Sequence, residues 1–327
     1  MQADFTMRNT LERTMFTGTI TPERLRKSVL SVPALARHAD LSLNVSANQA
    51  LVEHMRAGGV STFLYGGNAN FYNVGVGEYP AILDLLEALA GPDDWMIPSV
   101  GADFGKAMDQ IDILKSRAFP TAMVLPLRFP ATKAGAAKGL AKLAEHYGRK
   151  IIAYIKDEGF IAPEDAAALV KDGHVVAIKY AIVRDDPGQD AFLSKLVKLV
   201  DPALIVSGIG ERPIIDHARH FGLCAFTSGS VCVAPRLSSL IREAIQAGKF
   251  AEAEALQAHF MPLEYLRDGH SPLRVLHEAI RLAGIAETGP MLPFLSNIED
   301  PATLKQIASA AVGLRALNDK SAKLAAE

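Results

Sequence analysis

Eight short apolar runs recur along this chain, and most of them are followed by a stretch with helical periodicity. The runs are almost continuously apolar, whereas a strand with one face in solvent alternates polar and apolar residues. Continuous hydrophobicity is typical of parallel strands that are covered on both faces. We therefore expect eight parallel strands, within residues 28–35, 60–65, 95–100, 121–127, 150–155, 175–183, 203–207 and 223–227.

The segments between these runs have the pattern of helices that cover a sheet. In residues 190–200, for example, the apolar side chains recur on one helical face. Eight such βα units, of roughly 20 to 35 residues each, are the number and size expected for a (β/α)8 barrel. The rival is an open doubly wound sheet, which would carry a glycine-rich phosphate loop after its first strand. Residues 34–40 contain no glycine, so the sequence favours the α/β class with a (β/α)8 TIM barrel.

The two ends of the chain extend beyond the eight units. After residue 234 the pattern is purely helical, with helices expected over 237–248, 250–266, 271–284 and 301–317. We interpret the first as the eighth barrel helix and the others as a helical cap packed on the barrel. This divides the chain into an N-terminal extension (1–27), the barrel (28–248) and a C-terminal helical segment (249–327). In the extension, Thr21-Pro22-Glu23 predicts a helix start.

Composition narrows the class of partner. The chain of 327 residues has 34 Lys and Arg against 36 acidic residues, so no charge excess indicates nucleic acid or a membrane surface. Its two cysteines cannot build a disulfide framework, and no segment of about 20 uninterrupted apolar residues is present. The beginning of the chain lacks a signal-peptide pattern. We therefore expect a cytoplasmic protein whose partner is a small molecule.

Lys179 ends an apolar strand and is the residue with the most distinctive chemistry. In water its amine is protonated, but apolar surroundings disfavour the charged form and lower the pKa toward neutrality. A free amine there can condense with a carbonyl compound to form a Schiff base. The alternative is a lysine that extends its charge from a strand end into solvent.

In a parallel barrel the active groups lie at the carboxyl ends of the strands, so we consider these ends together. Tyr154, on the fifth strand, is a candidate acid and base. After the second strand, Gly66, Gly67 and Asn68 can present backbone N–H groups and an amide to a carboxylate, although an ordinary turn is an equal alternative. Further candidates for substrate binding are Arg128, Lys156 and Arg184, which add positive charge, and Ser207, Gly208, Thr227 and Ser228.

These strand ends resemble those of the dihydrodipicolinate synthase and N-acetylneuraminate lyase family of Schiff-base aldolases. The resemblance covers about residues 28 to 300 and is carried by Ile178-Lys179, by Tyr154 some 25 residues earlier, and by Ser207-Gly208. It implies that Lys179 forms the imine and that Tyr154 moves protons. It also implies a cofactor-independent lyase, no metal and a homotetramer.

The chain also departs from the family pattern. The Gly-Thr-Thr-Gly-Glu motif of the family's second strand is here Gly66-Gly67-Asn68-Ala69-Asn70, without either threonine. Leu127-Arg128 stands where a Tyr-Tyr pair is common, and Ile155-Lys156-Asp157 stands where Asn and Pro usually follow the tyrosine. These differences predict a retained imine-forming core inside a rebuilt substrate pocket.

Three functional hypotheses follow from these residues. The first is an aldolase, lyase or dehydratase acting on a 2-oxo acid such as pyruvate or a sugar-derived acid. The imine would make the carbon next to the former carbonyl acidic. Gly67, Asn68 and either Ser207 or Thr227 would hold the carboxylate, and Arg128 or Arg184 would contact an acidic tail. The second is a catalytically degenerate barrel that binds a 2-oxo acid as a sensor or scaffold. The third is a Lys179 that holds pyridoxal phosphate.

Overall fold

The computed structural model describes residues 15–324, so part of the predicted N-terminal extension (1–14) and the last three residues of the C-terminal segment lie outside the described residues. Eight parallel strands form a closed barrel in sequence order, because β1 pairs with both β2 and β8. Closure excludes the open sheet and confirms the predicted (β/α)8 barrel. The strands are β1 (Leu30–Ser31), β2 (Thr62–Tyr65), β3 (Trp95–Val100), β4 (Met123–Val124), β5 (Ile151–Ile155), β6 (Val175–Tyr180), β7 (Ile205–Ser207) and β8 (Ala225–Ser228).

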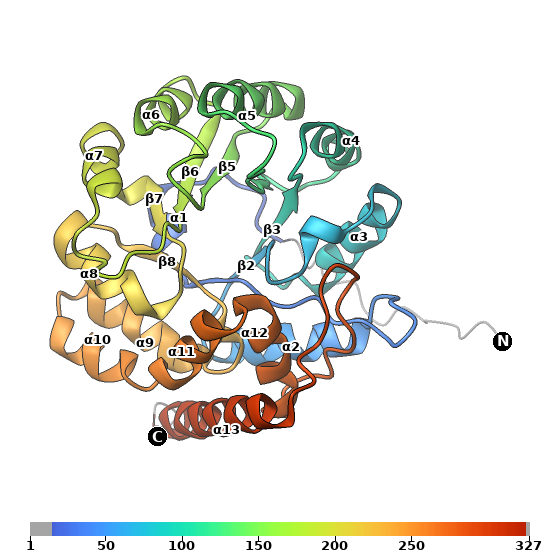
Figure 1. The fold of residues 1–327 in the computed structure, drawn as a ribbon, viewed down its shortest axis with the longest axis vertical. Helices are drawn as coiled ribbons and strands as arrows, with labels where there is room; N and C mark the ends of the chain where they lie inside the picture. Colours follow the sequence, from blue (N-terminus) through green and yellow to red (C-terminus); the bar gives the residue numbers. More distant parts are fainter. Residues whose placement is uncertain (1–14, 325–327) are drawn as a thin grey trace.

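The helices surround the strands, as Figure 1 shows in a view onto the strand ring. The barrel helices are α2 (Val45–Ala57), α3 (Tyr79–Leu89), α4 (Phe104–Leu114), α5 (Lys133–Tyr147), α6 (Pro163–Lys171), α7 (Ala191–Leu199), α8 (Glu211–Phe221) and α9 (Pro235–Gln246). Before them stands α1 (Pro22–Arg26), and short 3-10 turns are η1 (Phe71–Asn73), η2 (Val76–Glu78), η3 (Pro202–Leu204) and η4 (Ser230–Cys232). In α1, Thr21 caps the helix by accepting a hydrogen bond from the Arg24 N–H, as the Thr-Pro-Glu signal predicts.

The C-terminal segment consists of α10 (Phe250–Gln257), α11 (Met261–Gly269), α12 (Pro272–Leu282) and α13 (Pro301–Leu324). Residues 250–266, expected as one helix, form parts of two. Pro262 lies in the first turn of α11, where its missing N–H costs nothing, whereas inside one continuous helix it would break the ladder. Between residues 15 and 324, no helix is long and apolar enough to span a bilayer.

The alternation of β6 decides which of its side chains enter the barrel. Tyr180 points outward, because its ring stacks on Phe192 of α7 and its hydroxyl donates to Asp190. Successive side chains of a strand point to opposite faces, so Lys179 points inward. On the neighbouring strand the register pairs Lys179 with Tyr154. The fold therefore brings the predicted nucleophile and the predicted phenol together inside the barrel.

Candidate active site

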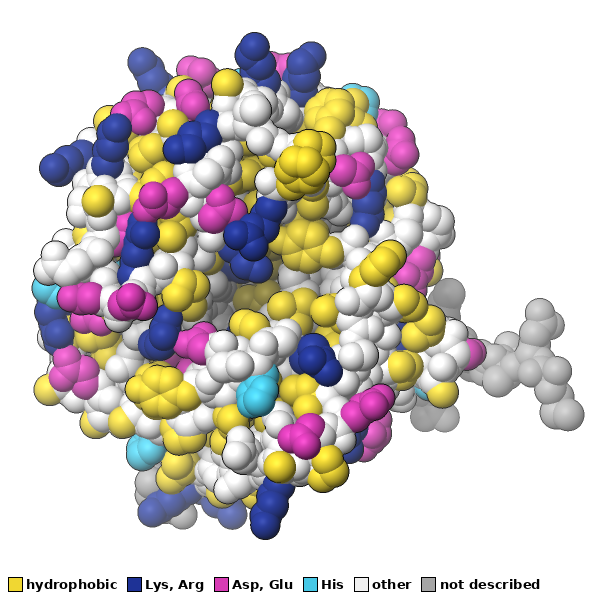
Figure 2. Space-filling model, in the orientation of Figure 1, with side chains coloured by type: hydrophobic (Ala, Val, Ile, Leu, Met, Phe, Trp, Pro, Cys, Tyr) yellow, Lys and Arg dark blue, Asp and Glu magenta, His cyan; other side chains and the backbone are white. Residues whose placement is uncertain are grey.

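A cavity of about 160 Å³ opens at the carboxyl ends of the strands. Figure 2 shows it as a hollow near the centre of this face, with Lys and Arg side chains beside it. Seven of the residues expected at the site line this cavity: Gly67, Asn68, Tyr154, Lys156, Lys179, Gly208 and Thr227. A second group of lining residues comes from the C-terminal helices and includes Glu264, Arg267 and Asp268.

Lys179 is 5% exposed, and no carboxylate pairs with it among residues 15–324. Burial lowers the pKa of its amine to about 7, and the positive charges of Lys156 and Arg267 act in the same direction. The lowered pKa greatly increases the fraction of free amine at neutral pH. At pH 7 an ordinary lysine has about one free amine in 3,000, whereas a lysine with a pKa of about 7 has about one in two.

Tyr154 places its ring directly beneath this amine, with Nζ of Lys179 at 3.9 Å from the ring centroid. The phenol is buried, and burial raises its pKa well above the usual value. It is therefore protonated at neutral pH and can donate a proton to an oxygen that develops charge nearby. Tyr72, of η1, lines the same cavity, and burial raises the pKa of its phenol to about 12.

Gly208 is required by the packing around Lys179. A Cβ on this residue would lie 2.7 Å from the Tyr180 carbonyl oxygen and 3.1 Å from Cγ of Lys179. Its N–H donates to the Tyr180 carbonyl at 2.6 Å, which holds the end of β7 against β6. Glycine at this position therefore lets the loop after β7 form the wall of the cavity beside the nucleophile.

The other expected residues lie elsewhere. Gly66 does not line the cavity, and a Cβ there would meet Met123 and Ser99. Ser207 is buried with its Oγ 2.9 Å from Nδ1 of His217, and Oγ of Ser228 accepts a hydrogen bond from the Val231 N–H. These hydroxyls have structural partners, so their placement does not support direct contact with a substrate.

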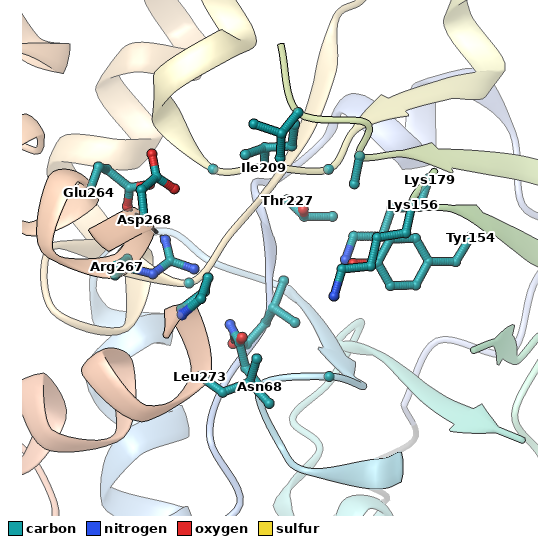
Figure 3. Close-up of a pocket in the computed structure, with 18 of the residues that line it drawn as sticks. Asn68, Tyr154, Lys156, Lys179, Ile209, Thr227, Glu264, Arg267, Asp268 and Leu273 are labelled. Atoms are coloured by element: carbon teal, nitrogen blue, oxygen red, sulfur yellow. Dashed lines mark hydrogen bonds and ion pairs between the residues drawn. The ribbon is translucent and has the colours of Figure 1, made fainter. Parts of the chain in front are cut away.

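The two candidate arginines also lie outside the cavity lining. Arg184 forms ion pairs with Asp190, at 2.9 Å, and with Glu158, and these pairs do not support the expected contact of its guanidinium with an acidic tail. The side chain of Arg128 is 79% exposed and faces Asp157 at 3.5 Å. In contrast, Lys156 lines the cavity, and Figure 3 shows its amine beside that of Lys179.

Glu264, Arg267 and Asp268 were not among the expected site residues, and they project from α11 into the mouth of the barrel (Figure 3). Nη1 of Arg267 donates to Glu264 at 2.7 Å, and Ser230 donates to the same carboxylate. Asp268 pairs with Arg212 at 2.9 Å. Residues 15–324 contain no cluster of side chains suited to a metal ion.

Searches by sequence found no matching family model and no matching curated protein. Comparison with solved structures found many chains of similar fold. Dihydrodipicolinate synthase from Bacillus clausii superposes with a TM-score of 0.77 at 18% identity, over 88% of this chain and 98% of that one. The enzyme of the same name from Oceanobacillus iheyensis gives 0.77 at 19% identity, over 91% and 98%.

The chain has the dihydrodipicolinate synthase fold. A third similar structure is YagE, an Escherichia coli K12 prophage protein described as a member of the dihydrodipicolinic acid synthase family and solved with pyruvate. It matches with a TM-score of 0.77 at 18% identity, over 88% of this chain and 98% of YagE. At these identities the likeness establishes the fold, and the chemistry has to be argued from the site itself.

Proposed function

We propose that this protein is a cofactor-independent class I lyase, an aldolase or dehydratase, that acts on a 2-oxo acid through a Schiff base at Lys179. The observation that carries the proposal is a buried, unpaired amine, with a pKa of about 7, at the mouth of a (β/α)8 barrel. The fold shared with dihydrodipicolinate synthases, and with a relative solved with pyruvate, supports it.

The first step joins the free amine of Lys179 to the C2 carbonyl carbon of the acid. The Nζ–C2 bond forms, the carbonyl π electrons move to oxygen, and that oxygen takes a proton. After the nitrogen has lost a proton and the oxygen has gained another, water leaves and an iminium remains. The ring of Tyr154 lies under this amine, and we assign its phenol the proton donated to the departing hydroxyl.

The iminium then acts as an electron sink. A proton or a carbon substituent at C3 can leave without its electrons, because the pair is delocalised onto nitrogen as an enamine. The same enamine can attack a second carbonyl compound or expel a hydroxyl group from C4. Bond cleavage, bond formation and loss of water therefore share one intermediate, which is why the proposal covers aldolase and dehydratase activity.

The carboxylate of the 2-oxo acid needs donors close to Lys179. Gly67 presents its backbone from the turn after β2, and Thr227 presents from β8 a hydroxyl whose partner, the Ser207 carbonyl, is at the long distance of 3.5 Å. Both line the cavity, and neither carries a charge that would compete with the nucleophile. We assign the C1 carboxylate to these two residues.

Reduction by borohydride in the presence of pyruvate tests the imine. We expect one reduced pyruvate adduct per chain, located at Lys179 by peptide mass spectrometry, and no adduct in Lys179→Ala. Lys195→Ala removes a lysine that is ion-paired on the outer surface and serves as the matched control, with an unchanged adduct. Absence of an adduct in the native protein, or equal labelling of Lys179→Ala, would contradict the proposal.

A second measurement separates an enzyme from a degenerate binding protein. An active site that reaches the enamine exchanges the methyl protons of pyruvate with deuterium from heavy water, which proton NMR detects. We expect exchange with the native protein and none with Lys179→Ala. Adduct formation without exchange would favour the sensor or scaffold hypothesis.

A further inference from the structure

Arg267 is a buried cation that the proposed imine chemistry does not use. Its side chain is 9% exposed and reaches the cavity from α11, outside the barrel strands. Nη1 is engaged by Glu264 at 2.7 Å. Within residues 15–324, nothing accepts a hydrogen bond from Nη2, and Nε is buried without a partner. A guanidinium held in this way has donors left for a ligand.

The amide of Asn68 converges on the same place. The position of a Cβ on Gly229 would lie 2.9 Å from Nη2 of Arg267 and 2.8 Å from Nδ2 of Asn68. Both donors therefore approach one point beside the loop after β8, and only glycine leaves them room there. Nδ2 of Asn68 uses one hydrogen for the Val32 carbonyl, at 2.9 Å, and keeps its second.

The nearby acidic groups are already engaged. Glu264 accepts from Arg267 and Ser230, and Asp268 pairs with Arg212. Glu211, which is buried close by, has its pKa raised by burial and by the charge of Glu264, which favours its neutral form. The charges of Arg267 and Glu264 therefore cancel, and an added anion would be bound by the unused N–H donors of Arg267 and Asn68.

Figure 3 shows Arg267 and Asn68 across the cavity from the amines of Lys156 and Lys179. An anion bound at Arg267 therefore belongs to a different part of the substrate from the carbonyl carbon that Lys179 attacks. We propose that Arg267 and Asn68 form a subsite for a second carboxylate, so that the substrate is a dicarboxylic 2-oxo acid. The proposal rests on the Schiff-base function and moves the acidic-tail contact from Arg128 and Arg184 to α11.

The test uses three 2-oxo acids and measures the concentration that gives half-maximal reductive trapping. 2-Oxoglutarate and 2-oxovalerate have the same five-carbon chain, and only the first has a second carboxylate; pyruvate has no tail. With the native protein we expect 2-oxoglutarate to need at least about tenfold less than 2-oxovalerate, since a charge-assisted pair discriminates by this much or more.

Replacing Arg267 together with its partner avoids leaving Glu264 as a lone buried charge. In the double variant Glu264→Gln/Arg267→Gln, the preference for 2-oxoglutarate over 2-oxovalerate should disappear. Trapping of pyruvate should change by less than about threefold when it is measured at pH 9, where the amine of Lys179 is largely free in the native protein and the contribution of Arg267 to its pKa matters least. Arg219→Gln/Glu254→Gln, which removes an exposed Arg–Glu pair of α8 and α10 outside the cavity lining, is the matched control and should keep the preference. If the double variant does not fold, Arg267→Lys should reduce the preference, since a single ammonium cannot reproduce the guanidinium fork.

The outcomes separate the two proposals. No adduct with any of the three acids would refute the Schiff-base function itself. A normal adduct with pyruvate, but no preference for 2-oxoglutarate in the native protein, would refute the subsite alone. An equal loss for all three acids in a folded double variant would also refute it, because Arg267 would then support the whole site.

Discussion

Nζ of Lys179 lies over the face of the Tyr154 ring, 3.9 Å from its centroid, because the two residues are paired in register on β5 and β6. This geometry gives Tyr154 two separable effects. Its ring shields the amine from water, which favours the free amine, but its π face also attracts an ammonium. Since the pKa of Lys179 is lowered to about 7, the effect of burial is the larger one.

Tyr154→Phe keeps the ring and removes only the hydroxyl. We expect the rate of imine formation with pyruvate to fall by roughly 10² to 10⁴, the usual contribution of a positioned acid or base. The pH midpoint of the reaction should stay near 7, because the ring still buries the amine. Trapping rates measured between pH 5 and 9 provide both numbers.

Tyr72→Phe is the matched control, since it removes the other phenol that lines the cavity. It should slow imine formation by less than Tyr154→Phe does. A larger effect from Tyr72 would transfer the proton-donating role to the loop after β2. A shifted pH midpoint in Tyr154→Phe would mean that the hydroxyl, and not the ring, sets the pKa of Lys179.

The buried amine should reduce the stability of the folded protein. Lys179 has a pKa of about 7 in the native state and about 10.4 in the unfolded chain, so the unfolded state binds more protons between these values. The free energy of unfolding therefore rises with pH between about 7 and 10.4. The destabilisation caused by burying this lysine is largest below pH 7. Lys179→Met should stabilise the protein more at pH 6 than at pH 9, by a margin of about 2 to 3 kcal/mol.

Denaturant unfolding of both proteins at the two pH values checks this prediction. The sign is diagnostic, because a lysine that reaches solvent would give the same difference at each pH. A Lys179→Met variant that is less stable than the native protein at pH 6 would contradict the predicted stabilisation and would indicate a counter-ion for the lysine.

The barrel could be predicted from the sequence because its signal is local. Each strand lies in a short apolar run, and the eight runs correspond to the eight strands. Some strands are much shorter than the runs that predicted them, because only part of the run pairs with its neighbours. Residues 28–35 contribute only Leu30–Ser31 to β1, and 121–127 contribute only Met123–Val124 to β4. Lys179 and Tyr154 could be named as candidates from the sequence, Lys179 as a lysine on an apolar strand and Tyr154 through its spacing from Lys179 in the family resemblance.

Arg267 was not recognisable, because its position depends on contacts that are distant in the chain. It follows Glu264 on a helix whose sequence resembles that of any charged surface helix, and only packing of α11 against the barrel turns both side chains into the cavity. Arg184, in contrast, was predicted as a site residue because it is near a strand end. Its guanidinium instead donates to Asp190, six residues later in the chain.

Arg184→Ala is therefore expected to affect stability and not substrate binding. Asp190 is buried and caps α7 through the Leu193 N–H, so losing Arg184 leaves a carboxylate with only Tyr180 and that N–H as partners. The free energy of unfolding should fall by about 2 kcal/mol, in the range for a buried hydrogen-bonded charge. Half-maximal trapping concentrations for pyruvate and 2-oxoglutarate should not change, and a selective rise for 2-oxoglutarate would restore Arg184 as a contact for the acidic tail.

The positive charge of Lys156 affects the pKa of Lys179, and replacing Lys156 by an uncharged residue of similar size isolates this effect. It lies beside Lys179 at the cavity, and its positive charge is the second cause, after burial, of the lowered pKa of Lys179. Lys156→Met removes the charge and keeps much of the side-chain volume, so the pH midpoint of imine formation should move to higher pH and the rate at pH 6 should fall. Lys156→Arg keeps the charge and should keep the midpoint. A purely electrostatic effect on the nucleophile disappears once the pH is high enough to deprotonate Lys179 in the native protein and in the variant. If both variants instead lower the rate equally at every pH, Lys156 contacts the substrate directly.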